Sequence, residues 1–286
     1  MKQIIYSKSI VLIFIMISLY SCKKDTTGGS NNNNNNNNGP AKTCYPITIT
    51  TQYSTGTTMV QKLFYDANHE VNKVITQQAG SEQAQILSRS SGQLRVDSYY
   101  SENGVTRHTD YDIYYVNGSN KADSITSFEC VDCNLDEPTS FKRINVQQLF
   151  YSGDKLVKSQ AKVVADLDSL EPYYYYYDNK GRLAQSVGGY LDGDTSIVTT
   201  LIYSSDESKI FKLSATFATQ DVIFGDSFSY SPQTTIIKNV GAFELTKFEW
   251  TNIANKDGYI ASASAAITRN GIAVGTETMT YEYDCF

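Results

Sequence analysis

A repeat of about 26 residues runs through most of this 286-residue chain. In each copy, aromatic or β-branched residues are followed by a polar group rich in Asp, Asn, Ser and Gly. The second position of the aligned copies falls at residues 65, 89, 115, 151, 177, 203, 230 and 283. Two strands of roughly eight to ten residues and two short loops fill about 26 residues, so each copy predicts one β-hairpin.

The stretch 41–286 has room for about nine such hairpins in one domain, which predicts roughly 16–18 antiparallel strands. Residues 81–87 form the only modest helical candidate, and no segment has a long apolar stripe with helical spacing. We therefore expect an all-β, up-and-down meander that is barrel-like, either closed, incompletely closed or flattened.

The end of the chain indicates which solvent surrounds this barrel. The chain ends in Phe286, as many outer-membrane barrels do, and in such barrels the residues in phase with the terminal aromatic face lipid. Here the in-phase residues are Asp284, Glu282 and Thr280, while Tyr283 and Tyr281 are out of phase. A lipid-facing strand would bury two carboxylates in hydrocarbon, so we predict a water-soluble barrel.

Residues 1–21 read as an export signal. Lys2 and Lys8 precede an apolar run at 10–19 that is too short to span a bilayer comfortably. The run ends in Leu19-Tyr20-Ser21-Cys22, which resembles the bacterial lipobox. That resemblance implies cleavage before Cys22, a diacylglycerol on its sulfur and the membrane as a partner. The alternative is an ordinary secretory signal in which Cys22 has no special role.

Residues 22–40 follow as a linker with eight consecutive asparagines at 31–38. The linker has almost nothing to bury and is predicted to be disordered, with an r.m.s. reach of about 20–25 Å. It would act as a spacer that holds the folded part away from the membrane surface.

One hairpin carries a recognisable motif. Residues 175–183 read YYYDNKGRL and look like the YD-repeat signature Tyr-x-Tyr-Asp-x-x-Gly-Arg-Leu, and residues 64–66 and 150–156 are weaker copies. With the lipobox and the Asn-rich linker, the chain resembles uncharacterised bacteroidete-type envelope lipoproteins with a porin-like all-β fold. The resemblance covers about residues 44–286, implies that fold and an outer-membrane lipoprotein of the cell envelope, and carries no catalytic residues.

If Cys22 is acylated, four cysteines remain, and an even number in an oxidising compartment suggests disulfides. Of the three pairings we favour Cys44–Cys285, which would join the first strand to the last, together with Cys130–Cys133. A Cys-x-x-Cys pair can also be a redox site, but no βαβ pattern surrounds it. A second cysteine pair for zinc is missing, so we expect no metal and no cofactor.

Tyr is the main aromatic residue, with 22 copies against 12 Phe and one Trp. In the run 173–177 one face, that of Tyr173, Tyr175 and Tyr177, is a candidate for stacking on sugar rings. The alternative is that one face packs in the core and the other covers neighbouring strands. His69 and His108 are candidate general bases, or else exposed polar residues of turns and strands.

Acidic groups at 132–137, 166–171 and 192–194 suit either calcium or simple turns, and none has the spacing of a full calcium loop. The formal net charge of −6 makes nucleic acid a poor partner. No nucleophile elbow, phosphate loop or dinucleotide fingerprint is present. We expect a monomeric, non-catalytic protein that binds a glycan or an envelope protein, or is structural; the alternative is a glycan-active hydrolase or a polysaccharide-uptake accessory protein.

Overall fold

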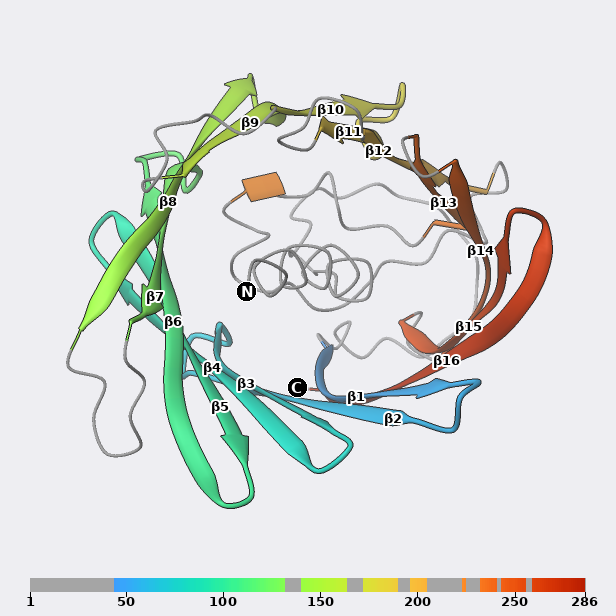
Figure 1. Ribbon diagram of the computed structural model, residues 1–286, viewed down its shortest axis with the longest axis horizontal. Coiled ribbons are helices and arrows are strands. Elements are labelled where there is room, and N and C mark those ends of the chain that lie inside the picture. The colour runs from blue at the N-terminus through green and yellow to red at the C-terminus, as the bar shows by residue number, and fades with distance from the viewer. Residues whose placement is uncertain are drawn as a thin grey trace, which may run out of the picture.

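The computed structural model describes residues 44–131, 140–163, 172–189, 196–204, 223–224, 232–240, 243–255 and 259–285. These residues form sixteen strands in one closed barrel (Figure 1). Every strand is antiparallel to its neighbours along the chain, and β1 pairs with β16 to close the ring. The predicted all-β, up-and-down meander is confirmed, with a strand number at the lower end of the expected range.

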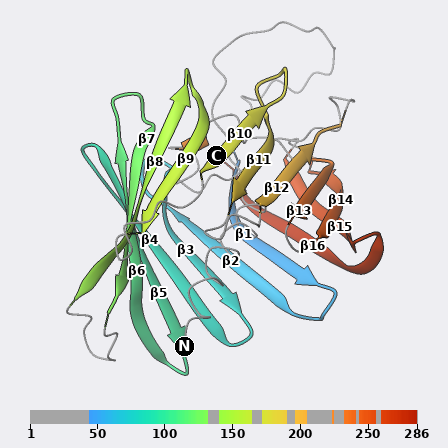
Figure 2. The same cartoon turned by 45° about the horizontal axis from the view of Figure 1, so that its top comes forward.

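The strands are β1 (Cys44–Tyr53), β2 (Thr58–Tyr65), β3 (Val71–Gln78), β4 (Ser81–Ser90), β5 (Gln93–Glu102), β6 (Val105–Val116), β7 (Ala122–Cys130), β8 (Phe141–Ser152), β9 (Lys155–Val163), β10 (Tyr173–Tyr177), β11 (Leu183–Gly189), β12 (Ser196–Ile202), β13 (Thr234–Asn239), β14 (Glu244–Ala254), β15 (Ile260–Arg269) and β16 (Ile272–Cys285). Figure 2 shows them inclined to the barrel axis, as closure of a sheet requires. Among the described residues, no helix is long and apolar enough to cross a membrane.

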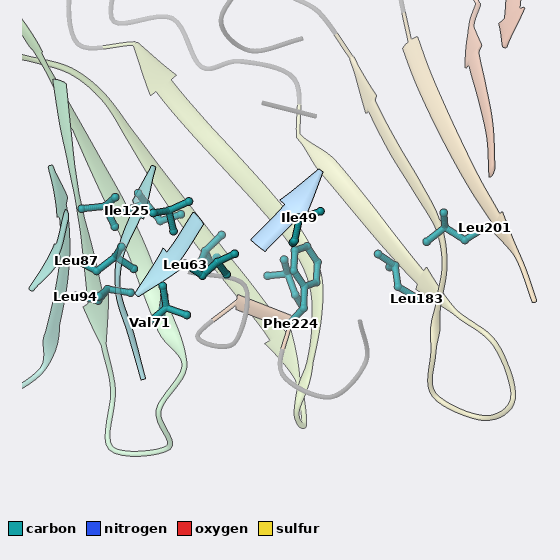
Figure 3. Packing of buried hydrophobic residues seen from close by; sticks show 14 residues of the cluster. Ile49, Leu63, Val71, Leu87, Leu94, Ile125, Leu183, Leu201 and Phe224 are labelled. Atoms are coloured by element: carbon teal, nitrogen blue, oxygen red, sulfur yellow. The ribbon is translucent and has the colours of Figure 1, made fainter. Parts of the chain in front are cut away.

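The core lies on the inner face of the barrel wall. In β2, the buried residues Met59, Gln61 and Leu63 alternate with the more exposed Val60 and Lys62. The same alternation along other strands collects Val, Leu and Ile side chains into one cluster, which Phe224 joins (Figure 3). Because side chains of a strand alternate between faces, each strand has one core-facing set and one outward-facing set.

The barrel has two rims, and the first residue of β1 and the last of β16 lie at the same one. We call this the terminal rim; the even-numbered strands end there and the odd-numbered strands begin there. Cys44 lies directly opposite Cys285 in the register, and a disulfide joins the two. The predicted pairing of first and last strand is therefore present in the structure.

Three turns of the terminal rim share one geometry that accounts for the YD-like motif. In the turn after β10, Oδ1 of Asp178 accepts hydrogen bonds from the backbone N–H groups of Lys180 and Arg182, at 2.9 Å each. Asp66 and Asn117 accept the equivalent bonds after β2 and β6. The fourth residue of each turn has a positive φ, which glycine adopts without strain at position 181.

The aligned position of the repeat also has a structural role at this rim. At six of the eight aligned positions, the side chain at the end of an even-numbered strand turns inward and donates a hydrogen bond to a backbone carbonyl near the start of the preceding strand, whereas aligned Tyr115 is 38% exposed. The donors are Tyr65 to Pro46, Arg89 to Val71, Tyr151 to Ala122, Tyr177 to Leu156, Tyr203 to Leu183 and Tyr283 to Ile260. The repeat therefore marks a side-chain hydrogen bond between neighbouring strands that recurs around one rim.

The one helical candidate was wrong. Residues 81–87 lie in β4, which pairs along its length with β5 and with β3 on its other side. Leu87 is buried, whereas Ile86 and Ser88 are exposed. Two neighbouring strands supply hydrogen bonds for its backbone, and this pairing outweighs a weak helical preference.

Candidate binding surface

The five tyrosines of β10 are divided between the two faces of the wall. Tyr173, Tyr175 and Tyr177 face inward, in the direction of the core cluster. The Tyr175 hydroxyl lies 3.1 Å from Oγ of Ser159, its ring meets Phe224 edge-on at 5.4 Å, and burial raises its pKa. These contacts match the packing alternative, and stacking of this face on a ligand stays a prediction.

Tyr173 owes its position to a missing side chain on the next strand. A Cβ built on Gly188 of β11 would lie 2.1 Å from Cε1 of the Tyr173 ring. Only glycine leaves room for a ring at this place, so Gly188 and Tyr173 fit as a pair.

Tyr174 and Tyr176 project from the outer wall instead. Their exposed fractions are 41% and 51%. Tyr174 lies opposite Lys158 of β9 on one side and opposite Val187 of β11 on the other. The face that was not singled out in the sequence is thus the one with solvent-accessible rings.

A second cluster occupies the outer face of β5 and β6. Arg95 binds Asp97 through two nitrogens, at 2.7 and 2.9 Å, and its guanidinium lies 4.0 Å from the centre of the Tyr111 ring. Nε2 of His108 lies 3.1 Å from Oδ1 of Asp97, although it makes no hydrogen bond of good geometry. The hydrogen bond to Asp97 raises the pKa of Arg95.

His108 is not the exposed residue that one interpretation expected. Its ring stacks on Tyr99 at 4.5 Å and contacts Phe141 at 4.6 Å, so aromatic rings lie near it on two sides. A general base must lie within reach of a reacting proton. The contacts of His108 are instead with packed aromatic rings, which fit a role in packing the outer face. His69 is exposed in the turn after β2, where it stacks on Tyr45.

Two carboxyl groups on the inner face have raised pKa values. Burial raises the pKa of Asp112 to about 6, despite a hydrogen bond from Ser127, and neighbouring Asp110 adds to the rise. Burial also raises the pKa of Glu277. Among the described residues, no group of three His, Cys, Asp or Glu side chains could hold a metal ion.

Several predicted sites fall outside the described residues. These are Cys22, Cys133 and the three acidic groups at 132–137, 166–171 and 192–194. Cys130, the last residue of β7, is disulfide-bonded.

Comparison with known proteins supports the fold. No protein-family model matches the chain, and no curated protein matches its sequence. Among solved structures, a porin-like protein from Bacteroides uniformis is similar, with a TM-score of 0.54 and 17% identity over 84% of this chain and 96% of that one. A porin-like protein from Bacteroides vulgatus gives 0.52 and 12% over 85% and 99%. The chain is thus similar in fold to porin-like proteins, as the resemblance implied.

The exposed apolar side chains of the terminal rim were not predicted from the sequence, although a pattern in the sequence marks them. The residue just before an inward-facing aligned tyrosine points outward because neighbours in a strand alternate. Phe64, Phe150, Tyr176 and Ile202 stand at this position, with exposed fractions between 41% and 51%. Apolar residues one place before each inward tyrosine therefore mark an outer surface, not the core.

Proposed function

We propose that the protein is a membrane-anchored lipoprotein of a bacterial cell envelope, whose barrel binds a partner without catalysing a reaction. The observation that carries the proposal is the Cys44–Cys285 disulfide, which joins β1 to β16 at the seam, the strand pair that closes the barrel. Disulfides of this kind persist in oxidising compartments outside the cytosol. Export is what residues 1–21 predict, and the lipobox-like Cys22 supplies the anchor. The similarity to Bacteroides porin-like proteins is in keeping with an envelope location.

The outer face of the seam favours a barrel surrounded by water. On the β1–β16 pair, Thr48 lies opposite Glu282 and Tyr45 lies opposite Asp284, on the face away from buried Ile49 and Tyr281. Ser264 and Thr278 continue this polar face on β15 and β16. Carboxylates on a lipid-facing strand are unfavourable, so the lipid group, not the wall, would hold the protein at the membrane.

The anchoring proposal is tested by changing Cys22 to Ala in the whole chain. The native chain is expected to incorporate labelled fatty acid and to sediment with membranes, and the variant to do neither. Extraction of the native membrane fraction with alkaline carbonate is the control for loose association. Membrane retention and unchanged labelling of the Cys22→Ala variant would refute the lipoprotein assignment.

A glycan-active hydrolase is the second candidate, and Asp112 is the observation in its favour. A carboxyl group with a pKa near 6 beside a second one, Asp110, is the kind of pair that can supply a general acid. Glycan hydrolysis that is lost in the Asp112→Asn variant would favour this candidate. Background rates for both proteins on every glycan tested would remove it.

A further inference from the structure

A row of outward side chains crosses six neighbouring strands of the barrel wall. Each member lies opposite the next in the strand register, from β8 to β13. The row is Phe150, Lys158, Tyr174, Val187, Val198 and Lys238. The ammonium group of Lys158 lies 5.2 Å from the centre of the Phe150 ring, so cationic and aromatic groups are in contact within the row.

The charge of this part of the wall is opposite in sign to that of the whole chain. Strands β8 to β13 contain no Asp or Glu, and the basic residues that the register places on their outer face are Arg143, Lys158, Lys162 and Lys238. The complete chain has 30 acidic residues against 24 basic ones. A basic stretch on an acidic protein creates a local positive potential, which attracts an anionic partner.

The aromatic side chains of the same wall are accessible. Phe150, Tyr174 and Tyr176 have exposed fractions of 41%, 41% and 51%. Exposed aromatic rings stack on the apolar faces of sugars, while ammonium groups pair with carboxylates. Neighbouring strands are about 4.8 Å apart, which is close to the length of one sugar unit in a polymer.

The curvature of the wall favours a flexible polymer over a flat membrane as its binding partner. The row follows six of the sixteen strands round the arc from β8 to β13 (Figure 1). A plane touches a cylinder along a narrow strip, so a bilayer cannot contact both ends of this row together. A flexible chain can follow the curvature and meet successive basic and aromatic groups.

We infer that the outer wall of β8 to β13 binds an acidic polysaccharide, with lysines pairing its carboxylates and Tyr174 and Tyr176 stacking on its sugar rings. The inference deepens the proposed function by naming a ligand class for the binding role. The anchoring experiment tests Cys22 alone, and the binding experiment tests the outer wall. Either proposal can therefore be refuted while the other stands.

The test measures binding of the whole mature chain to polygalacturonate, a polymer of uronic acids, by affinity electrophoresis and calorimetry. Lys158→Ser combined with Lys238→Ser is expected to lower the affinity about tenfold or more. Tyr174→Ser is expected to lower it without changing its dependence on salt. Neutral dextran should bind neither the native chain nor the variants.

Lys73→Ser is the matched control, because Lys73 of β3 lies 5.7 Å from the Phe64 ring on another part of the wall. It should leave the affinity within about twofold of the native value. Circular dichroism confirms that each variant is folded. The inference is overturned by absent binding, by equal binding of dextran, or by an equal loss in Lys73→Ser. Binding to phosphatidylglycerol vesicles that polygalacturonate does not displace would also overturn it and favour a membrane as occupant.

Discussion

The hydroxyl group of Tyr177 donates a 2.8 Å hydrogen bond to the carbonyl oxygen of Leu156, at the start of the strand before it. Tyr177 is the aligned position of the best YD-like copy, and five other aligned residues make the equivalent bond. Two contacts therefore account for the motif. An inward side chain donates a hydrogen bond to the preceding strand, and an Asp or Asn side chain accepts hydrogen bonds from the backbone of the turn.

Removal of this hydroxyl group should weaken the barrel. Tyr177→Phe leaves the Leu156 carbonyl without its donor, and we expect a loss of about 1 kcal/mol in the free energy of unfolding. Urea unfolding followed by tryptophan fluorescence measures the change. Tyr176→Phe, which alters the exposed neighbour on the outer wall, is the control and should unfold at the native midpoint.

The seam disulfide should stabilise the closed barrel. Cys44 and Cys285 are separated by 241 residues, so their bond constrains most of the unfolded chain. Replacing both with Ser is expected to lower the free energy of unfolding by about 2–5 kcal/mol. The same urea titration with and without reductant provides the comparison. An unchanged midpoint would show that pairing of β1 with β16 closes the barrel without help.

Gly188 and Tyr173 should behave as a coupled pair. Gly188→Ala places a methyl group where the Tyr173 ring lies, with an expected cost of about 1–3 kcal/mol. In the Tyr173→Ala background that methyl group no longer meets the ring, so its cost should largely disappear. A double-mutant cycle from thermal unfolding measures the coupling, and simple additivity of the two changes would contradict it.

Asp112 should make stability depend on pH. Its pKa is about 6 in the folded chain against an ordinary value of 3.8, so the folded state binds the proton more tightly. Stability is therefore highest below about pH 4, falls as the pH rises to about 6, and stays lower above it. Asp112→Asn should remove this loss and gain about 2–3 kcal/mol at pH 7.5.

Chemical unfolding of native and Asp112→Asn proteins at pH 4.0 and pH 7.5 gives the two values needed. The curves should come together at the lower pH and separate at the higher one. Asp284→Asn removes an exposed carboxyl of the outer face and serves as the control. A gain of equal size at both pH values would show that something other than proton binding causes it.

Much of the architecture was predictable from local patterns. The period of about 26 residues predicted hairpins and their number, because strand length and turn chemistry are written in neighbouring residues. The phase of Thr280, Glu282 and Asp284 against Tyr281 and Tyr283 predicted the two faces of the last strand, because alternation has a period of two.

Other features depended on contacts between distant residues. Sequence alone did not decide whether the meander closes, and closure rests on the register of β1 against β16. The helical preference of residues 81–87 lost to pairing with two neighbouring strands. Local sequence also did not show that Asp97 and His108, on different strands, lie side by side.

The amino-acid sequence by itself determined the repeat, the turns and the alternation of side chains, since each of these is settled within a few residues. The tertiary structure decided which face of every strand points into the barrel and which side chains meet across strands. For the tyrosines of β10 it placed Tyr173, Tyr175 and Tyr177 inside and left Tyr174 and Tyr176 exposed. The physical reason is that a strand presents two equivalent faces until its neighbours bury one of them.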